Sequence, residues 1–267
     1  MQQPPEPERE EHYFGLTPVQ LNTGVIGVLG LIVAGVCAWL FLFDGLDTVT
    51  GKKDVDQTAF SAQQVANGAI LKLSDLPEGW KATVEGDTGP EIDFEFSEGC
   101  KFLEQDTTVA EIASAQSDEL HGPSRQTLGS EASVFRADTI AADAFAIFTN
   151  WGSCRDETIA AFTQLIAESF REDGIDPSTV QINVTFDAVP APVLGDATGS
   201  MYRLGITMHV NDQQFNVTMD ILAMQRGRML GTLVYTAFNA PPSAEEEQQL
   251  AQLAAAKLIA AEASLDA

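Results

Sequence analysis

Apolar and polar residues alternate strictly along several segments of the chain. In residues 180–186 every second side chain is apolar and the side chains between them are polar. A period of two places the apolar side chains on one face and the polar ones on the other, which is typical of a half-buried β-strand. The same pattern predicts strands at residues 91–96, 204–210 and 215–221.

A further segment, residues 229–238, is apolar on both faces, as in a strand that is covered on both sides. The short polar turn Asn211-Asp212 lies between the two strands before it, and Arg226-Gly227 separates it from the second of them. Consecutive strands joined by short turns form an antiparallel meander. We expect residues 229–238 to be its central strand.

Apolar residues spaced three and four positions apart predict helices between and after these strands, at residues 59–73, 141–148 and 159–170. A last helix is expected to begin at Ser243, because Ser243-x-x-Glu246 matches a capping box. Helices packed on an antiparallel sheet form an α+β sandwich, which is the predicted fold class.

The longest apolar segment, residues 24–43, has no charge and no proline in its 20 residues. A helix of this length crosses about 30 Å of hydrocarbon. The alternative is a buried helix of a soluble protein, but Asp44 ends the segment sharply and Trp39 lies where a membrane interface favours indole. The acidic residues before it argue against a cleaved signal peptide. We therefore predict one transmembrane helix that contacts the lipid bilayer.

Small residues recur every four positions in this segment, at Gly30, Ala34 and Ala38. On a helix they share one face, and such a face lets two helices approach closely in lipid. It is a candidate helix-pairing face, although stripes of this kind also arise by chance.

These patterns divide the chain into four parts. The Pro- and Glu-rich start has little to bury, so residues 1–22 are expected to be a disordered cytoplasmic tail. The transmembrane helix at residues 23–43 and a polar linker at residues 44–65 follow. An extracytoplasmic α+β domain is predicted at residues 66–264.

Charge limits the partners of this domain. With 39 acidic against 14 basic side chains, the net charge is −25. Nucleic-acid binding depends on basic side chains that displace counterions from phosphates, so a nucleic-acid partner is excluded. The same charge repels anionic lipid headgroups, and the domain is expected to stand away from the membrane surface.

The cysteines and the basic residues give opposite orientations for the predicted helix. Cys100 and Cys154 are the two cysteines outside the apolar segment, and a pair in one domain favours a disulfide, which persists in oxidising compartments. Two separate buried thiols are the alternative. Arg9 before the helix and Lys52 with Lys53 after it would place the domain in the cytoplasm. We give the cysteines more weight and predict a single-pass protein of the cell membrane with its C-terminal domain outside.

Catalytic and metal-binding motifs are absent from the sequence. Neither glycine-rich phosphate-loop pattern occurs, nor does a G-x-S-x-G serine elbow. His121 and His209 each stand alone, with no second histidine within ten residues to build a zinc site. We therefore expect no enzyme activity, no cofactor and no metal.

Two further patterns have simple structural explanations. Acidic residues in the segment 85–98 alternate with a predicted strand and lack the spacing of a calcium loop, so a solvated face is favoured. Asn183-Val184-Thr185 and Asn216-Val217-Thr218 match the acceptor pattern for glycosylation, but they lie within predicted strands, and we assign them no role.

Several short features follow one another through residues 66–264, namely Leu76-Pro77-Glu78-Gly79-Trp80, Cys100, the 142–148 helix before Cys154, Leu194-Gly195-Asp196, Arg226-Gly227-Arg228 and the closing helix from Ser243. Together they resemble the extracytoplasmic sensor and lipoprotein domains of actinobacteria, such as the external domain of the mycobacterial serine/threonine kinase H. The resemblance implies a PsbP-like sandwich with a cleft or docking surface and no catalysis. This chain has one cysteine pair where the kinase has two, and no kinase domain.

We therefore expect a non-enzymatic, membrane-anchored domain that binds an envelope ligand. Trp80, Trp151 and Tyr202 are the candidates to line its cleft. The alternative is an accessory subunit of a larger bacterial membrane protein complex, held by the helix-pairing face and by an exposed apolar patch.

Overall fold

The computed structural model describes residues 57–83, 96–104, 110–172, 174–210, 213–240 and 243–265. Within these ranges no helix is long and apolar enough to cross a membrane. The predicted transmembrane helix at residues 23–43, with Gly30, Ala34 and Ala38, lies outside them. Most of the strand predicted at residues 91–96 also lies outside them.

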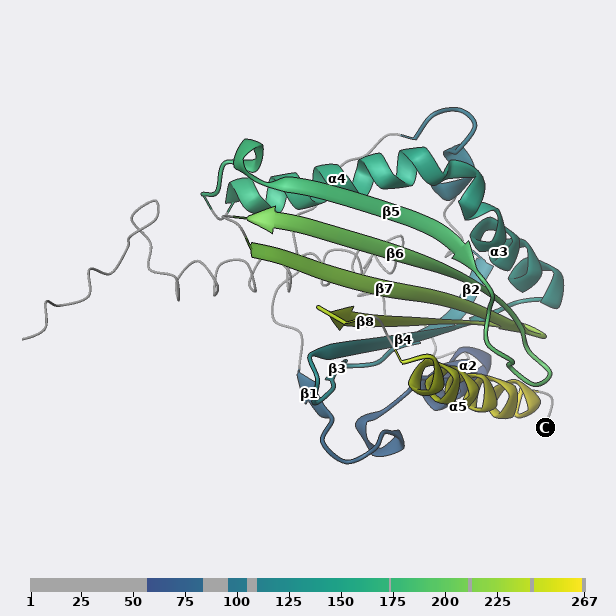
Figure 1. Ribbon diagram of the computed structural model, residues 1–267. Helices are drawn as coiled ribbons and strands as arrows, with labels where there is room; N and C mark the ends of the chain where they lie inside the picture. The colour runs from purple at the N-terminus through teal and green to yellow at the C-terminus, as the bar shows by residue number, and fades with distance from the viewer. Residues whose placement is uncertain are drawn as a thin grey trace, which may run out of the picture.

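An antiparallel sheet forms the middle layer of the domain (Figure 1). Its described strands are β1 Lys81–Thr83, β2 Glu111–Gln116, β3 Glu119–His121, β4 Gln126–Phe135, β5 Gln181–Val189, β6 Thr198–Val210, β7 Gln213–Arg226 and β8 Met229–Phe238. They lie in the order β1-β3-β4-β8-β7-β6-β5, and β2 also pairs with β4. β8 thus lies between β4 and β7, which confirms the predicted central strand.

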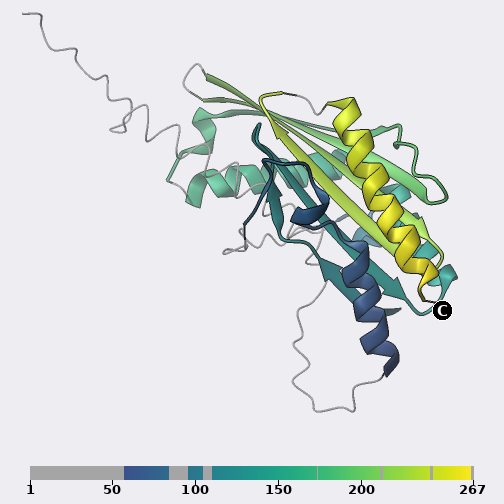
Figure 2. The same cartoon turned by 90° about the horizontal axis from the view of Figure 1, so that it is seen from below.

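Helices cover both faces of this sheet, as Figures 1 and 2 show. One face carries α2 Gln57–Ala69 and α5 Ala244–Ala263 side by side, and the other carries α3 Asp138–Asn150 and α4 Arg155–Glu172. Short 3₁₀ helices connect them: η1 Leu73–Asp75, η2 Lys101–Glu104, η4 Trp151–Cys154 and η5 Pro177–Thr179. The predicted α+β sandwich is confirmed for the described residues.

The first described helix lies partly in the range predicted as a linker. α2 begins at Gln57, and Ala62 and Ala66 on its inner face are 2% and 0% exposed. Both side chains belong to the core that α2 shares with α5. The folded domain therefore begins earlier than residue 66.

Strand alternation divides the interior into two cores. On β6 and β7, Met201, Leu222 and Met224 face α2 and α5, whereas neighbours such as Leu204 and Met219 face α4. Fully burying one such side chain contributes roughly 1.5–3 kcal/mol to folding. The sheet therefore cannot slip by one residue without exposing both cores.

The predicted disulfide between Cys100 and Cys154 is present, with 5.8 Å between the two Cα atoms. It joins the segment before η2 to the start of α4. Ser97 strengthens this junction, because its backbone N–H and its hydroxyl donate to the Glu157 carboxylate at 2.8 and 2.6 Å. Both hydrogen bonds lower the pKa of Glu157.

Candidate functional site

The sheet face that carries α5 changes its chemistry along the strands. Since side chains alternate, Met201, Arg203, Gly205 and Thr207 of β6 follow one another on this face. Their partners on β7 show the same progression, from Leu222 through Asp220 and Thr218 to Asn216. The face is thus apolar beneath α5, charged at the first turn of α5, and neutral and polar beyond it.

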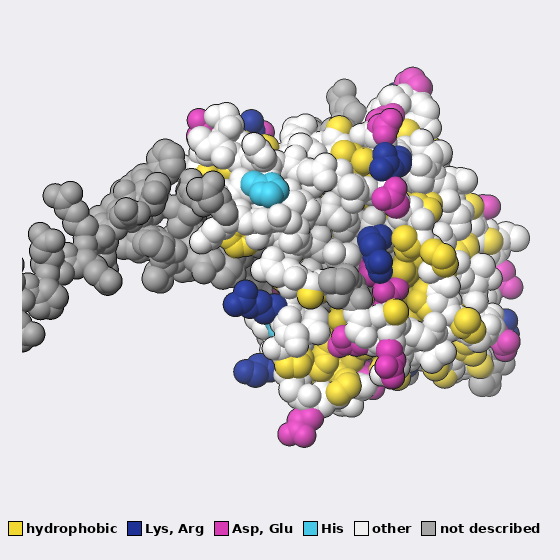
Figure 3. Space-filling view, in the orientation of Figure 1, with side chains coloured by type: hydrophobic (Ala, Val, Ile, Leu, Met, Phe, Trp, Pro, Cys, Tyr) yellow, Lys and Arg dark blue, Asp and Glu magenta, His cyan; other side chains and the backbone are white. Residues whose placement is uncertain are grey.

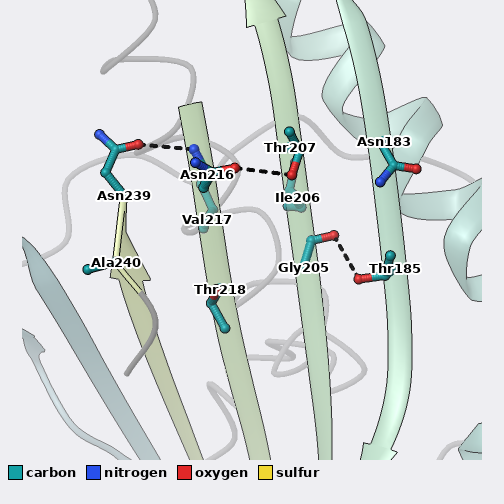
Figure 4. Close-up of a pocket in the computed structure, with 10 residues that line it drawn as sticks. All are labelled: Asn183, Thr185, Gly205, Ile206, Thr207, Asn216, Val217, Thr218, Asn239 and Ala240. Atoms are coloured by element: carbon teal, nitrogen blue, oxygen red, sulfur yellow. Dashed lines mark hydrogen bonds between the residues drawn. The ribbon is translucent and has the colours of Figure 1, made fainter. Parts of the chain in front are cut away.

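The neutral part of this face forms an open hollow of about 300 Å³ (Figure 4). Its lining comes from β5, β6, β7 and the two residues that follow β8, and comprises Asn183, Thr185, Gly205, Ile206, Thr207, Asn216, Val217, Thr218, Asn239 and Ala240. Ile206 and Val217 are 1% and 2% exposed and belong to the opposite core, so only their backbone reaches the hollow. We call this feature the polar hollow.

Hydrogen bonds fix one wall of the polar hollow. Asn239 has a φ of 59°, a left-handed conformation that Asn tolerates better than most residues. Its backbone N–H donates to the Asn216 carbonyl at 2.7 Å, and its side-chain oxygen accepts from the Asn216 N–H at 3.0 Å. The Asn216 side-chain oxygen accepts from Thr207 at 3.2 Å and from Gln214 at 2.9 Å. This wall is therefore held in place without a ligand.

Two other lining side chains, one on β5 and one on β7, offer polar groups that the protein does not use. Among the described residues, the side chains of Asn183 and Thr218 have no hydrogen-bond partner, and Figure 4 draws no bond from either to the rest of the lining. The Thr185 hydroxyl makes a long bond of 3.4 Å to the Gly205 carbonyl. A Cβ atom on Gly205 would lie 2.6 Å from this hydroxyl. A larger residue at position 205 would therefore fill part of the polar hollow. These groups are free to bind a ligand.

A row of paired charges borders the polar hollow. Arg203 donates to the Asp220 carboxylate at 2.6 and 2.8 Å and to Glu247 of α5 at 3.1 Å. Asp220 is 2% exposed. Its hydrogen bonds raise the pKa of Arg203, while burial, with Asp220 nearby, raises the pKa of Glu247 to about 7. In Figure 3 basic and acidic side chains alternate along this border, beside an area without charges.

Glu246, the neighbour of Glu247, makes a separate contact. It accepts a hydrogen bond from the Tyr235 hydroxyl at 2.9 Å. Burial, together with Glu246, raises the pKa of Tyr235. Two of the three acidic residues in the first turn of α5, Glu246 and Glu247, are therefore tied to the sheet, and they fix this end of α5 beside the polar hollow.

Of the three aromatic residues predicted to line a cleft, Trp151 and Tyr202 are in contact, with 5.7 Å between their ring centroids, whereas Trp80 lies on the other side of the sheet. Trp80 is 8% exposed in the core beneath α2 and α5, whereas Trp151 and Tyr202, 3% and 2% exposed, lie in the core of the other face. Trp151 donates to the Thr158 hydroxyl, and Tyr202 donates to the Thr149 carbonyl. All three rings are buried, and the polar atoms of Trp151 and Tyr202 are satisfied, so the three residues stabilise the cores instead of forming one cleft.

The two histidines of the described part are surface residues. His209 is exposed on the α5 face, and His121 lies 3.7 Å from the Glu119 carboxylate. Within the described ranges no three metal-ligating side chains gather into a site.

The polar hollow was missed in the sequence because its residues resemble ordinary strand and glycosylation patterns. The sequence nevertheless contains a pattern that indicates a polar surface, because an Asn-x-Thr tripeptide in a strand places both polar side chains on one face. Two such tripeptides occur, at residues 183–185 and 216–218, in strands that each pair with β6. Their register could have indicated a shared polar surface.

Comparisons with known proteins give one distant resemblance. No family model and no curated protein matches the sequence. Among solved structures, the chain is similar to the extracellular domain of PknH from Mycobacterium tuberculosis, with a TM-score of 0.26 and 10% identity. The match covers 54% of this chain and 62% of that one, less than two thirds of its length. No residue role is transferred from it.

Proposed function

We propose that this protein is a non-enzymatic binding domain, held outside a bacterial membrane by the apolar segment at residues 24–43, that takes a small polar envelope ligand into the polar hollow. The observation that carries the proposal is the hollow itself. It combines a wall fixed by hydrogen bonds with the unpaired side chains of Asn183 and Thr218. A fixed site with unused polar groups is suited to binding.

The chemistry of the lining supports binding rather than catalysis. Its described side chains that face the hollow are amides, hydroxyls and the methyl group of Ala240, and none of them is a carboxylate, imidazole or thiol that could serve as a base or nucleophile. The ionisable groups at the border, Arg203, Asp220 and Glu247, are paired with one another. The charged row therefore serves to position α5.

The disulfide and the charge of the chain support the location. Cys100 and Cys154 are joined, and structural disulfides form in oxidising compartments. A net charge of −25 keeps the domain soluble and separated from anionic lipid headgroups. Both properties fit a domain displayed outside the membrane.

The test is co-purification of the full chain from its native membrane in a mild detergent. Gly205→Val is expected to fill the polar hollow, and Gly129→Val is a matched control, because a Cβ on this β4 glycine meets nothing within 4 Å. We expect mass spectrometry to find a small polar compound with the wild type and the control, and at least tenfold less with Gly205→Val.

Two results would contradict the proposal. If a stoichiometric set of membrane proteins accompanies the chain and no small ligand does, the protein is an accessory subunit. If a small ligand is retained equally by Gly205→Val, the polar hollow is not its site. Equal thermal unfolding midpoints of the two variants are required for the comparison.

A further inference from the structure

The chemistry of the polar hollow restricts the class of ligand. We infer that it binds an uncharged saccharide of one or two rings, an inference that rests on the proposed function. The residues that line the hollow are a poor match for charged ligands, for apolar or aromatic ligands and for extended peptides, and they are a good match for a sugar ring.

Charged ligands find no counter-charge in the polar hollow. The described lining has no ionisable side chain. Arg203, which lies two residues before Gly205 on the same face, already donates to the carboxylates of Asp220 and Glu247 at 2.6–3.1 Å. An anion would have to compete with two carboxylates that are already in place, one of them fully buried, and would also meet a chain with a net charge of −25.

Apolar and aromatic ligands find little surface to pack against. Ala240 provides the only apolar side chain that faces the described lining, because Ile206 and Val217 point into the opposite core. Among the described residues, the lining contains no aromatic ring on which a nucleobase could stack. An acyl chain or a nucleobase would therefore leave its large faces in water.

An extended peptide is also a poor match. Peptides that extend a sheet need the free backbone groups of an edge strand. β5 is the end strand of the described order, but its unpaired backbone groups lie in the plane of the sheet, whereas the polar hollow lies on the face of β5, β6 and β7. On that face Thr185, Gly205 and Thr218 are already paired in register. The hollow also lacks an apolar pocket for an anchoring side chain.

The arrangement of polar groups matches a sugar ring. Neighbouring strands lie about 4.8 Å apart, and residues two apart on one strand lie about 6.7 Å apart. The pairs Asn183/Thr185, Gly205/Thr207 and Asn216/Thr218 therefore form a grid of amides and hydroxyls around the bare backbone of Gly205. Amides and hydroxyls both donate and accept hydrogen bonds, as sugar hydroxyls do.

The size of the polar hollow and its open side both fit a saccharide of one or two rings. A volume of about 300 Å³ is at the lower end of the range of ligand sites, which is roughly 300–1,000 Å³. The hollow is open on one side, so further units of a glycan chain can extend away from it. We expect a Kd of about 0.01–1 mM, because few apolar contacts add to the hydrogen bonds.

Saturation-transfer NMR on the full chain tests the inference, in a phosphocholine detergent without a sugar headgroup. The probes are a panel of neutral mono- and disaccharides, including glucose, galactose, mannose, arabinose and N-acetylglucosamine, with glucuronate and glucose 6-phosphate as anions and acetyl-trialanine amide as a peptide. The hollow variant is Asn183→Ala with Thr218→Val. The control is Asn150→Ala with Thr198→Val, two exposed residues outside the polar hollow.

We expect a neutral saccharide to bind the wild type and the control, with at least tenfold weaker binding to the hollow variant. If no neutral saccharide binds, or if binding is equal in both variants, the inference is wrong. If an anion or the peptide binds in a hollow-dependent way, the saccharide class is wrong but the proposed function stands. If no probe and no co-purified compound binds less to the hollow variants than to the wild type, both the saccharide inference and the proposed function are wrong.

Discussion

At the scale of single residues, Glu247 makes the stability of the fold depend on pH. Burial and the nearby Asp220 raise its pKa from 4.5 to about 7, although Arg203 opposes the shift. Tyr235 and Glu246 lie in the same charged neighbourhood. The folded state thus binds this proton more tightly than the unfolded state does, so the contribution is complete below about pH 4.5 and is lost as the pH rises towards about 7.

Thermal unfolding between pH 4.5 and pH 7 measures this dependence. We expect the unfolding midpoint of the wild type to fall, relative to that of Glu247→Gln, as the pH increases through this window. Glutamine keeps the shape of the side chain but does not titrate, so it isolates the proton of Glu247. A difference that is constant with pH would show that folding does not shift the pKa of Glu247, and a difference that grows in favour of the wild type would show that folding lowers this pKa; either result contradicts the prediction.

The Arg203–Asp220 pair gives a second prediction at this scale. Replacing Arg203 with Met leaves the carboxylate of Asp220, which is 2% exposed, without its bidentate partner. We expect the free energy of unfolding to fall by about 3 kcal/mol in chemical denaturation. The double variant Arg203→Met with Asp220→Leu should recover most of this loss, because it also removes the buried carboxylate that the single variant leaves unpaired. No recovery would mean that Arg203 acts mainly through packing or Glu247.

At the scale of elements, hydrophobic periodicity predicted the second half of the sheet but not the first. β5 to β8 alternate cleanly or are apolar throughout, so each strand was found. β4 was missed because serine, glycine and alanine dominate its centre, and buried Ser130 and Ser133 look polar in the sequence. Ser130 is buried because its hydroxyl accepts a hydrogen bond from the Leu71 N–H at 2.8 Å, a contact between residues 59 positions apart.

The candidate site shows the same limit of sequence reasoning. Trp80, Trp151 and Tyr202 were chosen as large side chains that often line clefts, but large rings also contribute most to a core when they are buried. The polar hollow depends instead on strand register, which brings residues 183–185 and 216–218 to opposite sides of β6. Register over a long sheet is set by tertiary packing, and local periodicity does not reveal it.

The first turn of α5 shows how the tertiary structure alters a local motif. Ser243 caps the helix as predicted, since its hydroxyl accepts from the Glu246 N–H at 3.5 Å, but the Glu246 carboxylate bonds to Tyr235. The capping box is therefore only half formed. We expect Ser243→Ala to lower the free energy of unfolding by about 0.5–1 kcal/mol, with exposed Ser124→Ala as a near-neutral control. Equal effects of the two would show that Ser243 does not cap α5.

At the scale of the whole molecule, the disulfide connects the stability of the fold to its location. Cys100 and Cys154 are 54 residues apart, and closing a loop of this length stabilises a fold by about 4 kcal/mol on the chain-entropy model. The bond also holds the segment before η2 against α4, alongside the Ser97–Glu157 contacts. Reduction, or Cys100→Ser with Cys154→Ser, should therefore lower the free energy of unfolding by about 2–5 kcal/mol.

Labelling the thiols of the full chain in intact cells tests the location. The chain has three cysteines, so a disulfide between Cys100 and Cys154 leaves Cys37 as the one free thiol. After rapid denaturation with iodoacetamide, mass spectrometry is expected to find one label without reduction and three after it. Because the reducing cytoplasm keeps such a pair as thiols, three labels before reduction would place the domain inside, in agreement with the positively charged residues after the apolar segment.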